Sequence, residues 1–125
     1  MNKQSIYIAQ FGTGTNINLL PLGAGQLYSR LKQDNKLCDK FELGEIIFRR
    51  PEDPAAWADQ LSDVFVIGFS AFMWTVKISL RSAKAVKDRF PNALVIIGGP
   101  SIPKDWDYYE DFMHDNPFVD VICVD

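Results

Sequence analysis

Hydrophobic segments alternate with amphipathic ones along the whole chain. Five nearly continuous apolar runs, bounded by glycine, proline or polar residues, predict strands at residues 5–11, 41–48, 64–70, 93–97 and 119–124. Between these runs, apolar residues at helical spacing predict helices from residue 20 to about 35, from 53 to 61, from 76 to 90 and near 106–113. Strands and helices therefore alternate from one end of the chain to the other.

The first two predicted helices carry local signals. The apolar residues expected to form the buried face of the first helix are Leu20, Ala24, Leu27 and Leu31. Asp53 followed by Pro54 predicts the start of the second helix, because aspartate caps free N–H groups and proline is preset for the first turn.

This order of elements predicts an α/β fold, a flavodoxin-like or Rossmann-like doubly wound sheet. Right-handed crossovers give a five-stranded parallel sheet with strand order 2-1-3-4-5. Residues 1–125 are expected to form one domain. Since no helical pattern follows the fifth strand, we expect a fragment of a longer protein or a neighbouring domain that covers this edge. A natural edge strand is the alternative.

Composition narrows the class of partner. Hydrophobic residues make up 47% of the 125 residues, enough for a core. The 13 Lys and Arg against 16 Asp and Glu give a net charge of -3, without the basic cluster that nucleic-acid binding needs. No apolar stretch reaches the roughly 18 residues of a membrane span, and the N-terminus does not resemble a signal peptide. We therefore expect a cytoplasmic protein with neither a nucleic-acid nor a membrane partner.

Few residues offer metal or nucleophile chemistry. Cys38 and Cys123 share no metal-ligand spacing, and we expect two reduced thiols, with Cys123 in a buried strand. The single histidine, His114, is expected on the surface of the last helix, remote from Ser70 at the end of the third strand. A hydrolase that uses Ser70 as nucleophile is thus disfavoured, because it needs a histidine base.

The most informative residues follow the strands. Open parallel sheets bind ligands beyond the carboxyl ends of their strands. Glycines there let a ligand approach the backbone closely, hydroxyl and amide groups offer hydrogen bonds, and Phe72, Met73 and Trp74 offer apolar surface. The candidate cofactor-binding residues are Gly12, Thr13, Gly14, Ser70, Ala71, Phe72, Trp74, Gly98, Gly99 and Pro100.

Other readings of these residues exist. Residues 12–17 lack the third glycine of the dinucleotide-binding fingerprint, and no phosphate-binding P-loop occurs in the chain. Ser70 could simply cap the third helix, residues 98–100 could form an ordinary turn, and residues 72–74 could pack as core. Gly23 and Gly25 could merely let the first helix lie close to the sheet.

Four segments, in order, resemble one family. Residues 20–27 resemble a Pro-x-Gly-x-x-x-Leu helix opening, and residues 63–70 with Trp74 are similar to a third strand and its loop. Lys87 to Pro91 followed by residues 95–100 resembles a Lys-x-x-x-Pro … Gly-Gly-Pro pattern. Residues 119–122 resemble the strand before a Gly-Glu-Gly-Glu segment. Together they are similar to the N-terminal cobalamin-binding domain of cobalamin-dependent radical S-adenosylmethionine (SAM) proteins.

The resemblance implies that cobalamin (vitamin B12) lies across the carboxyl ends of the sheet. Ser70 would contact the nucleotide tail or a corrin amide, Gly98 and Gly99 would line the tail channel, and Trp74 would sit at the corrin's lower face. The Asp-x-His-x-x-Gly motif of the other cobalamin class is absent, because Phe112 and Pro117 stand at its Asp and Gly positions around His114. This implies a base-off cofactor without a histidine ligand.

The same resemblance assigns catalysis elsewhere. A [4Fe-4S] cluster needs three cysteines at Cys-x-x-x-Cys-x-x-Cys spacing, which this chain lacks. The cluster and SAM would belong to a downstream radical SAM domain of the same polypeptide, the expected partner. The hypothesis is a cobalamin-binding module of a methyltransferase-type radical SAM enzyme, itself without a catalytic residue. The alternative is a flavodoxin-like domain that binds another nucleotide-type ligand or acts as a protein-interaction module.

Overall fold

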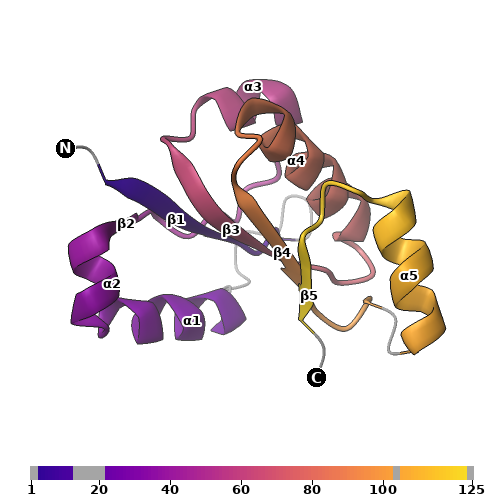
Figure 1. Ribbon diagram of the computed structural model, residues 1–125, viewed down its shortest axis with the longest axis horizontal. Helices are drawn as coiled ribbons and strands as arrows, with labels where there is room; N and C mark the ends of the chain where they lie inside the picture. The colour runs from indigo at the N-terminus through magenta and orange to yellow at the C-terminus, as the bar shows by residue number, and fades with distance from the viewer. Residues whose placement is uncertain (1–2, 13–21, 103–104, 124–125) are drawn as a thin grey trace.

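The computed structural model describes residues 3–12, 22–102 and 105–123, and in them a single parallel sheet. Its strands lie in the order β2-β1-β3-β4-β5 (Figure 1), which confirms the predicted topology. Their bounds are β1 (Gln4–Ala9), β2 (Phe41–Leu43), β3 (Val64–Ser70), β4 (Leu94–Gly98) and β5 (Val121–Cys123).

Within these described ranges, five helices connect the strands. They are α1 (Leu22–Lys32), α2 (Asn35–Lys40), α3 (Pro54–Asp59), α4 (Val76–Arg89) and α5 (Trp106–Asp115). Figure 1 shows α1 and α2 on one side of the sheet and α3 and α4 on the other. The crossovers β3-α4-β4 and β4-α5-β5 advance in the same direction across the sheet, so right-handed connections place α4 and α5 on one face. None of the helices in the described ranges is both long and apolar enough to cross a membrane.

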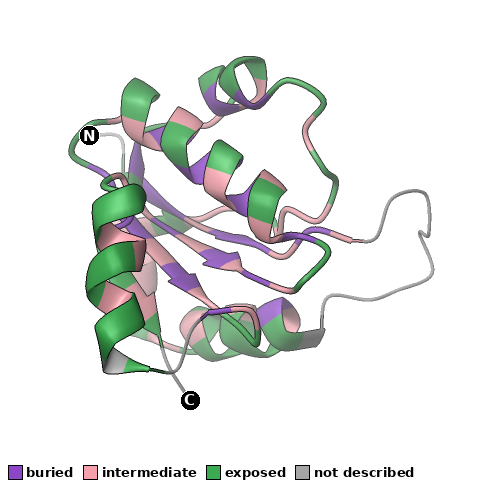
Figure 2. Ribbon diagram, turned by 90° about the vertical axis from the view of Figure 1, so that its right-hand side faces the viewer, coloured by how far each residue is buried: buried purple, intermediate pink, exposed green. Residues whose placement is uncertain are grey.

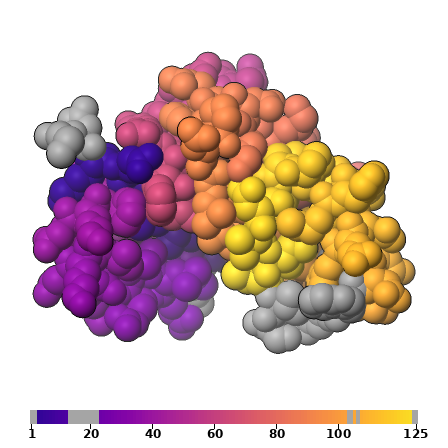
Figure 3. Space-filling model, viewed as in Figure 1, coloured from indigo at the N-terminus to yellow at the C-terminus, as the bar shows by residue number. Residues whose placement is uncertain are grey.

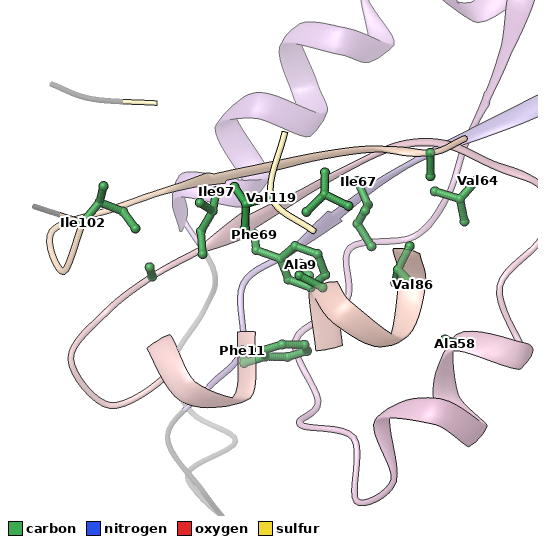
Figure 4. Close-up of a cluster of buried hydrophobic side chains, with 14 residues drawn as sticks. Ala9, Phe11, Ala58, Val64, Ile67, Phe69, Val86, Ile97, Ile102 and Val119 are labelled. Atoms are coloured by element: carbon green, nitrogen blue, oxygen red, sulfur yellow. The ribbon is translucent and has the colours of Figure 1, made fainter. Parts of the chain in front are cut away.

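The main core lies between the sheet and α4. Ile67 of β3 and Ile97 of β4 are fully buried there, as is Val86 of α4. Near the carboxyl end of the sheet the rings of Phe11, Trp57 and Phe69 pack edge to face or tilted, with centroids 6.2–6.5 Å apart. Figure 4 shows the buried cluster with Phe11, Phe69 and Ile67 labelled, and Figure 2 shows the buried positions along the strands and the inner sides of α3 and α4.

The first predicted helix, from residue 20 to about 35, is confirmed as α1, and α2 is an additional helix that was not predicted. The Asp34 carboxylate accepts a hydrogen bond from the Leu37 N–H at 3.1 Å and so caps α2. Ala24 and Leu27 were both predicted to lie on the buried face of the first helix. The prediction is confirmed for Ala24, which is 1% exposed, and is wrong for Leu27, which is 59% exposed. Leu20 lies outside the described residues.

Two predicted strands are shorter than expected. The second ends at Leu43, and beyond it the chain stays beside the first strand: the Gly44 N–H donates to the Ile6 carbonyl at 2.9 Å, and Ala9 and Ile47 form a bridge. The fifth is reduced to β5, and its Cys123 is exposed, so the expectation of a buried thiol is wrong.

Candidate functional site

The loops that follow β1, β3 and β4 form what we call the rim. Most of the predicted site residues lie on it: Gly12 after β1, residues 70–74 at and after the end of β3, and residues 98–100 at and after the end of β4. The structure brings the last two groups together, because Ser70 and Gly98 are partners in the β3–β4 register. Thr13 and Gly14 lie outside the described residues.

Two backbone hydrogen bonds join the β3 and β4 loops. The Ala71 N–H donates to the Gly98 carbonyl at 2.6 Å, and the Ser101 N–H donates to the Ala71 carbonyl at 2.9 Å. Gly99, between them, has φ of +127°, a conformation that side chains disfavour. The loops thus approach closely, and the amide of Ala71, one of the predicted cofactor-binding residues, is used within the protein.

The loop between β3 and α4 is organised by buried hydroxyls. The Thr75 Oγ1 accepts a hydrogen bond from the Phe72 N–H at 3.1 Å, and the Ser79 Oγ donates to the Ser70 carbonyl at 3.1 Å. Thr75 is the residue at the N-cap position of α4, so the alternative in which Ser70 caps this helix is wrong. The Ser70 hydroxyl itself makes no hydrogen bond to any described residue, which leaves it available to a ligand.

An aromatic platform stands on this loop. The rings of Phe72 and Trp74 stack with centroids 5.3 Å apart and an interplanar angle of 9°. Trp74 is 52% exposed and the neighbouring Met73 is 81% exposed. The alternative in which these residues form plain core is therefore wrong for Met73 and Trp74, and a large apolar surface faces solvent beside the rim.

Arg50 is a rim residue that the sequence analysis did not identify. Its Nε donates to the Gly12 carbonyl and its Nη2 donates to the Trp74 carbonyl, both at 2.7 Å. The guanidinium therefore joins the loop after β1 to the loop after β3. No motif signals this role, since the acceptors are backbone carbonyls that only the fold brings together.

One face of the sheet is open beneath the rim. Residues in register on neighbouring strands point to the same face, and successive residues alternate between faces. The open face is made of three such rows: Val66 with Leu94, then Gly68 with Ile96 and Val121, then Ser70 with Gly98 and Cys123. None of these residues is buried, whereas the partners on the other face, Ile67, Phe69, Val95 and Ile97, all are.

The open face begins where α1 stops covering the sheet. On β1, Ile6 and Ile8 are at most 9% exposed, and the Ala24 N–H of α1 donates to the Gln10 side chain at 2.9 Å. By contrast, a Cβ placed on Gly68 of the adjacent strand would meet no atom within 4 Å. Figure 3 shows the surface recessed between α1 and β5. A flat group could therefore lie against the backbone of β3 and β4 here.

In the described part of the chain, no three His, Cys, Asp or Glu side chains come close enough together to hold a metal ion. His114 lies in the last turn of α5, and its side chain is 90% exposed. Since α5 connects the carboxyl end of β4 to the amino end of β5, His114 in its last turn lies toward the end of the sheet opposite the rim. A hollow of about 490 Å³ between α3 and α4, lined by Asp59, Arg81 and other charged residues, contains none of the predicted site residues.

Comparisons with known proteins give two informative relatives, and no protein-family model matches the chain. The cobalamin-dependent radical SAM methyltransferase TokK of Streptomyces tokunonensis is 33% identical over 104 residues, 83% of this chain. The 2-(S-pantetheinyl)-carbapenam-3-carboxylate methyltransferase of Streptantibioticus cattleyicolor is 31% identical over 106 residues, 85% of this chain. In both cases the match spans only 15% of the relative's length. The resemblance stated from the sequence is thereby confirmed.

Proposed function

Because this chain is a relative of the cobalamin-dependent radical SAM methyltransferases over most of its own length, we propose that it is a cobalamin-binding module. The observation that carries the proposal is the open face: two glycines, Gly68 and Gly98, lie on a half-exposed sheet surface, and the loop after β3 on the adjoining rim carries the exposed Trp74. Cobalamin combines a broad, flat corrin ring with a nucleotide tail that ends in a flat base. A surface with a platform and an adjoining groove fits both parts.

The nucleotide tail would lie on the open face. Gly68 leaves free space above the backbone, and Ile96, its partner in the register, supplies apolar contact for a flat base. The Ser70 hydroxyl, which has no partner among the described residues, would donate a hydrogen bond to the tail. These residues fit the group because they offer room, apolar surface and a hydroxyl group in one place.

The corrin ring would lie over the rim. Phe72, Met73 and Trp74 would face its lower side, and Gly12 and the Gly99–Pro100 turn would let it approach the backbone. Thr13 and Gly14 remain predictions from the resemblance. Since His114 lies at the far end of α5, no imidazole of this chain would reach the cobalt. The cofactor would be bound base-off, because its tail base would lie on the open face and not beneath the cobalt.

Catalysis would require a larger protein. Cobalamin supplies a metal centre that can carry a methyl group, while this chain's own residues bind and orient it. The chain spans about 15% of the length of the relatives it matches, so a further domain with a [4Fe-4S] cluster and SAM belongs to the proposal for the whole protein. Methyl transfer would take place between the two domains.

A binding experiment tests this function. The chain is incubated with hydroxocobalamin, passed through a gel-filtration column, and its visible spectrum is recorded. We expect the red chromophore to elute with the protein, and His114→Ala to give the same spectrum, since this histidine is not a ligand. Protein that elutes colourless, or that retains flavin mononucleotide in a parallel run and not cobalamin, would overturn the proposal in favour of another flat ligand.

A further inference from the structure

Arg50 is carried to the rim by backbone pairing. After β2 ends, the chain runs beside the carboxyl end of β1, and the Ile47 carbonyl accepts a hydrogen bond from the Gln10 N–H at 2.9 Å. The Phe48 carbonyl accepts one from the Gly12 N–H, also at 2.9 Å. These two bonds fix the segment that precedes Arg50, so its side chain starts from a defined point beside the first loop of the rim.

The guanidinium then spans two loops. Its Nε and Nη2 groups donate to the carbonyls of Gly12 and Trp74, which follow neighbouring strands of the sheet. The donors of a guanidinium are held in a rigid plane, so two simultaneous bonds fix the separation of the two acceptors. Lysine, a point charge on a flexible stem, cannot impose this geometry.

This arginine is unlike an ordinary surface arginine. Within the described ranges its charge forms no ion pair with a carboxylate, whereas Arg89 pairs with Asp59 at 3.4 Å. Its strong donors are instead used on two backbone oxygens at short distance. The interaction therefore orders loops and does not neutralise charge.

The loop that Arg50 pins carries the aromatic platform. The Trp74 ring is half-exposed and is held on one side by the Phe72 ring, so its position depends on the backbone beneath it. We propose that Arg50 is a positioning residue that holds Trp74 at a fixed distance from the Gly12 loop, so that the corrin ring meets a preformed rim. The inference rests on the proposed function only for the identity of the ligand.

Three variants test the inference. Arg50→Met removes both bonds, Arg50→Lys keeps the charge without the planar fork, and Arg49→Met is the matched control, because Arg49 is an exposed neighbour with no hydrogen bond or ion pair among the described residues. Melting temperatures establish that each variant folds. The first readout needs no cofactor: acrylamide quenching of Trp74 fluorescence, obtained by subtracting the signal of Trp74→Phe in each background. The second is hydroxocobalamin affinity by absorbance titration.

We expect Arg50→Met to raise the quenching of Trp74 and to weaken hydroxocobalamin binding about tenfold, because an unordered rim must be ordered on binding. Arg50→Lys should recover only part of both effects, and Arg49→Met should match the unchanged chain. Full recovery by lysine, or unchanged quenching in Arg50→Met, would overturn the positioning role. If the unchanged chain does not bind hydroxocobalamin, the proposed function fails, while the quenching comparison still decides the role of Arg50.

Discussion

Gly99 lies so close to Ala71 that no other residue fits there. A Cβ on Gly99 would stand 2.7 Å from the Ala71 carbonyl oxygen and 2.8 Å from its nitrogen, and φ of +127° disfavours any side chain. Gly99→Ala should therefore cost roughly 1–3 kcal/mol of unfolding free energy in urea titrations. Gly25→Ala is the control, because a Cβ on this helical glycine meets nothing within 4 Å, and it should stabilise by about 0.5–1 kcal/mol. Equal effects of the two variants would contradict this interpretation.

Gly68 differs from Gly99 in that a side chain added to it would enter open space. Gly68→Leu should fold with unchanged or slightly higher stability, because a strand residue replaces glycine without a clash. It should weaken hydroxocobalamin binding about tenfold or more, because the side chain fills the space proposed for the nucleotide tail. Gly25→Leu, which fills a hollow lined by residues of α1 and by Gln33 and by none of the open face, should leave binding unchanged. Retained affinity in Gly68→Leu would place the tail elsewhere.

Trp74 should matter for the ligand and little for stability. Trp74→Ala removes a half-exposed ring that packs mainly on Phe72, so we expect a change in unfolding free energy within about 1 kcal/mol. Retention of hydroxocobalamin on gel filtration should fall clearly. Tyr108→Ala removes a comparably exposed aromatic ring from α5 and should leave retention unchanged. A large loss of stability in Trp74→Ala would indicate a core role instead.

Asp120 joins β4, β5 and α4 away from the rim. Burial raises the pKa of its carboxyl, but hydrogen bonds from Lys87 and the Val95 N–H, together with the charge of Lys87, outweigh burial and hold that pKa below its ordinary value of 3.8. The lysine of the Lys-x-x-x-Pro pattern is thus a structural residue, whose ammonium also donates to the Ala93 carbonyl at 2.7 Å. We therefore expect the ionised Asp120 carboxylate to contribute to the free energy of unfolding, and this contribution to depend on pH.

Because the folded pKa is depressed, this contribution is complete above about pH 3.8 and is lost as the pH falls through the folded value. Asp120→Asn should lower the unfolding free energy by roughly 1.5–3 kcal/mol at neutral pH, and the difference should shrink in acid. Asp88→Asn is the control, since its pair with Lys84 is exposed and should contribute about 0.3–0.5 kcal/mol. A pH-independent difference for Asp120→Asn would contradict the assignment.

The strand at the middle of the sheet was predicted correctly from the sequence, because its apolar residues favour a strand and its buried position in the fold requires one. Residues 64–70 form β3 as predicted, since an apolar run at the middle of a parallel sheet has no competing structure. Helix α2 was not predicted although Asp34 is a cap residue, because its six residues are too few to show an apolar period. The close approach of Gly44 to the Tyr7 ring, a contact distant in sequence, was not predicted either.

The candidate site was predicted in part. Glycines and aromatic residues after strands marked the rim, because a strand end followed by such residues is visible in the sequence. An uncovered edge at the fifth strand was expected, but the extent of the open face as far as Gly68 of β3 was not predicted, since it depends on which faces the helices cover. Arg50 was missed because its partners are carbonyl oxygens, which every residue carries and no pattern distinguishes.

The central claim is that the open face and the rim bind a corrinoid. Backbone amide shifts of the ¹⁵N-labelled chain, followed during titration with hydroxocobalamin, test this most directly. We predict shifts concentrated at Gly68, Ser70, Ile96 and Gly98 on the open face and at Trp74 on the rim, with the amides of α3 and α4 unchanged. Saturable shifts confined to the charged hollow between α3 and α4, or no saturable shifts at all, would contradict the account.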